Sequence, residues 1–229
     1  MNDNKKDMDQ LTGAQRIELA LNRFLANHLK VAVIILVVIV IGLIGLGIGT
    51  SVSRKKTQAQ FDQIDQLQQQ YRELAYLDSE EDGYQAQYDS LIADLTVLAD
   101  KSKKYPGQKA IYLLGLAAYE HEEFQSALDY FIKSAEAGKQ TYLGSLSLAN
   151  AAASAENLGN DTLALEYWTR IIDEYGFGAA ESPKALFGQA RLQLKAGNTD
   201  LAKATLQQLA DQFPTSEFSK LAANSLVTL

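Results

Sequence analysis

Few residues in this chain could carry out chemistry, and none has a partner at catalytic or metal-binding spacing. The two histidines are His28, beside a long apolar run, and His121, in a polar stretch between helical segments. Neither has a second metal ligand at the spacing that protein metal sites use. Ser145, Ser147 and Ser154 lie on predicted repeat helices without a nearby base, so we expect them to be structural. Cysteine is absent, which excludes thiolate nucleophiles, thiolate metal sites and disulfides.

Two short motifs resemble ligand loops without meeting their requirements. The glycine-rich run GLIGLGIG, residues 42–49, lacks the strand–turn–helix context of a phosphate loop. The acidic run DSEEDG, residues 78–83, lacks the alternating oxygens and final bidentate glutamate of a calcium loop. We therefore expect no enzyme activity, no cofactor and no metal, which leaves binding as the function.

Composition narrows the class of partner. The chain has 229 residues, of which 47% are apolar and 21% charged, as in globular proteins. After Lys56 there are 24 acidic and 13 basic residues, a net charge of −11. A domain this acidic repels phosphates, so we expect protein partners rather than nucleic acid. We also expect no small-molecule substrate.

A repeat with spacings of 37 and 38 residues is the most informative feature of the sequence. Small residues recur at two positions of each unit, and a large apolar residue follows the second of them by four positions. Two antiparallel helices approach closely where small side chains face each other, and the large residue covers the next layer, so the units must stack. The three sets are Gly115, Ala152 and Ala190; Ala127, Ala164 and Ala202; and Phe131, Trp168 and Leu206.

These positions, together with Pro214 at the end of the last unit, resemble the tetratricopeptide repeat. We predict an all-α chain in which one N-terminal transmembrane helix precedes a tetratricopeptide-like solenoid of stacked antiparallel helix pairs. The repeat domain covers residues 61–229. Its parts are a degenerate first unit at 61–106, units at 108–141, 145–178 and 183–215, and a capping helix at 216–229.

In such a solenoid the first helix of each unit lines the concave surface, which is the predicted protein-binding groove. Tyrosines and Phe187 would anchor apolar groups there, and cations at the C-terminal end would attract an acidic segment. The alternative for Tyr112 and Phe187 is a place in the core between repeats. The candidates are Lys109, Tyr112, Leu116, Tyr119, Glu120, Glu156, Asn157, Lys184, Phe187, Arg191 and Lys195.

An apolar run near the N-terminus predicts a membrane span. Residues 31–48 carry no charge and, with their flanks, reach the roughly 20 residues that cross a bilayer core. We predict an amphipathic leader at 1–28, a transmembrane helix at 29–50 and a juxtamembrane linker at 51–60. Arg54, Lys55 and Lys56 suit a membrane-edge anchor better than the start of a mature chain. Cleavage as a signal peptide near residues 49–51 and burial as a soluble helix are the alternatives.

Two parts of this N-terminal region offer contact surfaces. The leader places Ile17, Leu21 and Phe24 at helical spacing, which suits either a helix lying on the membrane surface or a simple run-in to the span. In the span, Gly45 and Gly49 form a small-xxx-small pair that allows close approach of a second helix. The alternative is that glycine is merely common in membrane helices. The predicted contact face comprises Gly42, Gly45 and Gly49.

Charge alone leaves the orientation close to a tie, because three cations flank each side of the span. The lead-in IELALNRFLANHLKVAVIILVV, with Phe24-Leu25-Ala26 and then Lys30 directly at the span, resembles the YfgM-type ancillary subunits of the SecYEG translocon. The resemblance implies an inner-membrane protein of diderm bacteria with a cytoplasmic leader and a periplasmic repeat domain. It also implies contact with translocon subunits, periplasmic chaperones and exported chains. The alternatives are an envelope scaffold for flagellar, secretion or division machinery, and a cytoplasm-facing scaffold.

Overall fold

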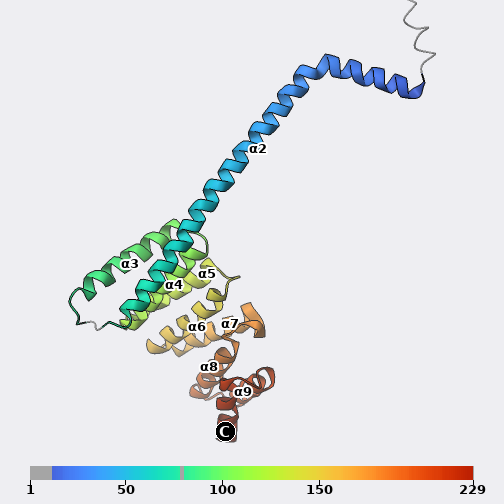
Figure 1. Cartoon of the computed structure of the whole chain (residues 1–229). Helices are drawn as coiled ribbons and strands as arrows, with labels where there is room; N and C mark the ends of the chain where they lie inside the picture. The colour runs from blue at the N-terminus through green and yellow to red at the C-terminus, as the bar shows by residue number, and fades with distance from the viewer. Residues whose placement is uncertain (1–11, 78–79, 229) are drawn as a thin grey trace, which may run out of the picture. The chain divides into compact units, whose positions relative to one another are not determined.

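The computed structural model describes residues 12–77 and 80–228, and every regular element in these residues is a helix (Figure 1). Successive helices pack on one another along the chain, which confirms the predicted all-α class built from antiparallel helix pairs. The elements are α2 (Gly13–Leu74), α3 (Tyr84–Lys101), α4 (Tyr105–Glu120), α5 (Phe124–Ala137), α6 (Tyr142–Asn157), α7 (Asp161–Tyr175), η1 (Gly176–Gly178), α8 (Ser182–Lys195), α9 (Thr199–Gln212) and α10 (Glu217–Thr228).

The chain divides into two compact units, Met1–Gln58 and Ala59–Leu229, which are described separately. In the first unit α2 begins after Thr12, whose amide donates to the Gln15 side-chain oxygen at 3.0 Å. This bond satisfies one of the amides left open at a helix start. Residues 51–60, the predicted linker, are helical as part of α2. Residues 1–11 of the predicted leader lie outside the described residues.

The apolar run of α2 stays exposed in the first unit. Ile34, Val38 and Ile41 each have more than half of their surface open. By length and composition alone, one helix of the described residues, Val33–Leu74, is apolar enough to cross a membrane, and none of its most apolar window is buried. Such a surface needs an apolar solvent or partner, because water disfavours it.

The second unit consists of helix pairs that share their cores. Ile64 and Leu67 at the end of α2 pack with Leu91 and Leu95 of α3 in a cluster that also includes residues of α4. The pairs α4/α5, α6/α7 and α8/α9 follow, and α10 closes the series by burying Ala222 against α8 and α9. Each pair therefore completes its core with the next one, as a solenoid requires.

Glycines and alanines allow the close approach between helices. Ala127, Ala164 and Ala202, at the predicted small positions of the second helices, are fully buried. A Cβ atom at Gly115 would lie 2.7 Å from the Phe131 ring, which is far inside van der Waals contact. The small residues thus set the distance at which the large rings pack.

The turns between the two helices of each repeat share one backbone motif. The chain enters the left-handed region there, and the next amide bonds back to a carbonyl five residues earlier, as in a Schellman ending. The left-handed residues are Glu122 (φ 59°), Gly159 (φ 72°) and Gly197 (φ 80°). Two turns use glycine, which adopts this conformation without steric cost, whereas the α4–α5 turn uses a glutamate.

Glu122→Gly is therefore expected to stabilise the repeat domain. A non-glycine residue in the left-handed region costs about 1 kcal/mol, which the substitution removes. The measurement is the free energy of unfolding of the full-length protein in detergent by urea titration. Glu123→Gly removes the same charge at a residue with φ −79° and serves as the matched control. Equal effects of the two substitutions would contradict the proposed backbone origin.

Candidate protein-binding groove

The tyrosines of α4 form a stripe that faces α6. Tyr105, Tyr112 and Tyr119 are each seven residues apart, so they lie on one face of the helix. The hydroxyls of Tyr105 and Tyr142 lie 2.9 Å apart. The Tyr112 hydroxyl accepts from the Asn150 amide at 3.0 Å. These bonds hold the first helices of two successive units side by side.

Tyr119, seven residues after Tyr112 on α4, makes the same kind of contact with α6. Its hydroxyl accepts from the Asn157 amide at 2.8 Å, and its ring packs edge-on against Phe124. Tyr112 also has a second role, because its ring lies 5.7 Å from that of Phe131 in the core. The Tyr112 ring thus contacts the core while its hydroxyl pairs with α6, and its role in binding a partner stays a prediction.

Two further candidates tie α4 to the end of α2. The Lys109 ammonium forms an ion pair with Asp65 at 3.1 Å, and only 12% of the lysine side chain is exposed. Glu120 accepts a hydrogen bond of 2.6 Å from the Tyr71 hydroxyl. Both carboxylates are thus engaged within the fold, one by a cation and one by a phenol.

Three of the predicted groove residues meet in one pocket. Lys109, Tyr112 and Leu116 line a cavity of about 220 Å³ formed by α2, α4 and α6. Sequence reasoning missed the rest of its lining. The additional residues are Gln68, Tyr71, Arg72, Leu113, Tyr142, Leu143 and Leu146.

Glu156 is a junction between α6, α7 and α8. One carboxylate oxygen accepts from the Trp168 indole nitrogen at 2.9 Å, and the other pairs with Arg191. Arg191, which we expect to attract an acidic segment, forms this ion pair with about half of its side chain exposed.

The other C-terminal candidates also contact the protein itself. Lys195 pairs with Asp161 at 2.5 Å. Lys184 lies with its ammonium 5.6 Å from the centre of the Trp168 ring. Phe187 packs against Phe218 of α10, so it contributes to the last core cluster. The structure therefore does not gather these residues with those of the α2/α4/α6 pocket.

The predicted membrane contact face is open where it is described. Apart from the adjoining residues and backbone of the same helix, no atom lies within 4 Å of a Cβ placed at Gly42 or Gly49. The surroundings of Gly45 lie outside the described residues. Gly42 and Gly49 border a shallow hollow with Leu46 and Arg54 on the same helix.

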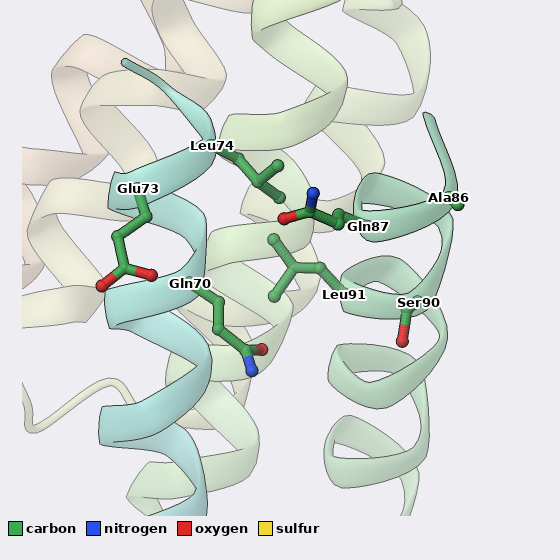
Figure 2. Close-up of a pocket in the computed structure, with 7 residues that line it drawn as sticks. All are labelled: Gln70, Glu73, Leu74, Ala86, Gln87, Ser90 and Leu91. Atoms are coloured by element: carbon green, nitrogen blue, oxygen red, sulfur yellow. The ribbon is translucent and has the colours of Figure 1, made fainter. Parts of the chain in front are cut away.

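A second hollow, of about 410 Å³, lies between α2 and α3, as Figure 2 shows. Leu74 and Leu91 form its floor and are almost fully buried. Gln70, Glu73 and Gln87 surround them with polar groups. The terminal unit of a solenoid needs a polar outer face to stay soluble, and the polar side chains around this hollow provide one.

In the part of the chain that the structure describes, no group of three or more His, Cys, Asp or Glu side chains could hold a metal ion. The His121 ring packs at a tilt against the Tyr88 ring, with ring centres 4.6 Å apart. Burial is the main reason that the pKa of Tyr112 lies above its usual value, so its hydroxyl stays protonated.

Comparison with known proteins agrees with the repeat geometry in one segment. Residues 184–216, which contain most of α8 and all of α9, match the family model described as tetratricopeptide repeat. No curated protein matches the sequence. Among solved structures, an Arabidopsis OM64 TPR domain is 16% identical, covers 53% of this chain and 94% of its own, and superposes with a TM-score of 0.44.

These observations define the class of protein. The helix pairs and their shared cores make the second unit a solenoid of tetratricopeptide-like helix pairs, of which residues 184–216 match the tetratricopeptide repeat. Solenoids of this type bind protein segments on extended concave surfaces.

Glu156→Ala is expected to destabilise the protein by roughly 1–3 kcal/mol, because it leaves the buried Trp168 indole without an acceptor. Glu156→Gln keeps an acceptor and should cost less. Trp168 is the sole tryptophan, so its fluorescence reports the change directly during urea unfolding. Glu166→Ala, on the exposed face of α7, is the control and should stay within about 0.5 kcal/mol of the unsubstituted protein. If Glu156→Ala left the free energy of unfolding unchanged, the role of Glu156 in joining α6, α7 and α8 would be refuted.

The raised pKa of Tyr112 predicts a loss of stability in alkali. Above pH 10 a tyrosine ionises in the unfolded chain while Tyr112 stays protonated in the folded one, so the unfolded state binds fewer protons. Stability should therefore fall as pH rises past 10, by up to about 1.4 kcal/mol per pH unit for this residue. Urea midpoints between pH 9 and 11.5 should fall less steeply in Tyr112→Phe. Tyr76→Phe, at an exposed position, should leave the slope unchanged.

Proposed function

We propose that this chain is a non-enzymatic, single-pass adaptor of a bacterial inner membrane. In this proposal residues 29–50 span the bilayer, the leader lies in the cytoplasm and the tetratricopeptide-type domain lies in the periplasm. The domain acts beside the SecYEG translocon and contacts periplasmic chaperones or emerging chains.

The observation that carries the proposal is the presence, on one chain, of an exposed apolar helix and a repeat domain with a preformed pocket. A scaffold held at a membrane has a high effective concentration near any complex in that membrane. Weak contacts in the groove are then sufficient for function. A pocket lined mainly by leucines and tyrosines suits such contacts with protein segments.

The orientation is supported by the lead-in sequence and by the basic residues of the leader. Lys5 and Lys6 add positive charge before the span, which favours a cytoplasmic N-terminus. A long domain after a span is translocated with little regard to its charge. The acidic repeat domain is therefore compatible with export.

Protease access in spheroplasts tests the topology. With an N-terminal tag on the full-length protein, protease added outside should remove the repeat domain and leave a tagged membrane fragment. Digestion only after the membrane is opened would overturn the periplasmic placement. Loss of the tag from the mature protein before protease treatment would instead show cleavage as a signal peptide. A cytoplasmic protein probed in parallel shows that the spheroplasts are intact.

Site-specific crosslinking tests the partner. A photo-crosslinking residue at Tyr142, on the rim of the pocket, should capture translocon subunits or periplasmic chaperones in living cells. The same residue at Lys133, exposed on α5 and outside the pocket lining, is the matched control. Capture of flagellar, secretion or division proteins alone from Tyr142 would replace the translocon by another envelope assembly.

A further inference from the structure

We propose that the pocket among α2, α4 and α6 holds one aromatic or branched aliphatic side chain of a partner polypeptide, with an acidic residue next to it. This inference rests on the proposed function in taking the partner to be a protein. It adds the chemistry of the segment that is recognised and the residues that recognise it.

The floor of the pocket accepts an apolar side chain. Leu113 and Leu143 form its buried base, while Leu116 and Leu146 are half-buried and leave apolar surface open to a ligand. The volume of about 220 Å³ exceeds the roughly 150 Å³ that suffices for a benzene ring in an apolar protein cavity. One ring or one branched chain therefore fits, whereas an entire helix does not.

Arg72 is a cation of the pocket lining that forms no ion pair with a described residue. Lys109 pairs with Asp65, whereas Glu120 keeps its negative charge while it accepts a hydrogen bond from the Tyr71 hydroxyl. The Arg72 guanidinium is thus available to a ligand carboxylate, which it can bind with two parallel hydrogen bonds.

This local charge differs in sign from that of the domain as a whole. The residues after Lys56 carry a net charge of −11, so acidic segments are repelled by most of the surface. Within the pocket, an acidic residue beside the apolar anchor would meet the unpaired cation Arg72. Such a pattern favours a defined register of the bound segment over general attraction to the domain.

The Tyr112 hydroxyl supplies a further polar contact. It accepts a hydrogen bond from Asn150, so its own proton is left for a ligand oxygen. Tyr112 lines the same pocket as Arg72. A backbone carbonyl next to the anchor side chain is a suitable acceptor, and it fixes the direction in which the segment enters.

Peptide binding to the full-length protein in detergent micelles tests the inference. Four fluorescently labelled peptides share a glycine–serine sequence and differ at two adjacent central residues: Phe-Asp, Ala-Asp, Phe-Asn and Phe-Lys. Fluorescence anisotropy should show that Phe-Asp binds most tightly. Replacing Phe by Ala should weaken binding about tenfold, and replacing Asp by Lys should weaken it by a similar factor.

A charge reversal separates recognition from folding. Arg72 is exposed, so Arg72→Glu should fold normally and bind Phe-Lys about tenfold better than Phe-Asp, the reverse of the unsubstituted protein. Leu146→Trp should fill the pocket and weaken all peptides that contain Phe. Lys133→Glu on α5 is the matched control and should keep the original order.

Three results would overturn the inference: equal affinities for Phe-Asp and Ala-Asp, an unchanged order in Arg72→Glu, or no binding of any peptide. Each of them leaves the crosslinking and topology results of the proposed function untouched. Conversely, a cytoplasm-facing domain with the expected peptide preferences would overturn the cellular proposal and leave the pocket chemistry standing.

Discussion

The contact between an aromatic ring and a glycine backbone is the constraint on which the repeat domain depends. The Phe131 ring rests against Gly115, and the Trp168 ring rests against Gly188 of the following unit. With a Cβ at either glycine, the helices would have to move apart, because neither ring can yield inside a filled core. The first contact sets the distance between α4 and α5, and the second sets the distance between α7 and α8.

Hydrogen bonds and ion pairs between the helices then restrict how each helix rotates against its neighbours. Tyr112–Asn150 and Tyr119–Asn157 join α4 to α6, and Glu156 joins α6 to both α7 and α8. A half-buried polar group needs a partner, so each of these bonds also selects one register of stacking. Most polar side chains on this surface therefore already have a partner within the protein. A ligand can contact only the polar and apolar groups that remain without one.

The repeat period alone predicts the helix pairs, because small and large residues recur at fixed spacing in three units. It also places Lys109, Tyr112 and Leu116 on the groove, since they belong to the first helix of a clear unit. The repeat pattern does not identify Tyr71 and Arg72 as pocket residues, because the end of α2 lies in the degenerate first unit. Tyr142 could have been identified, since it follows Tyr105 by one repeat period of 37 residues. The compensation of Arg191 by Glu156 joins residues in different units. Charge pairing at such distances depends on tertiary geometry, which a sequence pattern does not contain.

The walls of the α2/α4/α6 pocket come from three successive units, and this has a consequence for how the scaffold works. Repeat arrays lose structure from their ends, so an array whose first unit has frayed lacks the wall that α2 supplies. The measured affinity is then the intrinsic affinity scaled by the fraction of molecules with the first unit docked. A bound segment in turn stabilises the docked first unit, because the segment binds only when that unit is stacked on the next one. With the ligand proposed for this pocket, capture of the segment and ordering of the first repeat are one equilibrium.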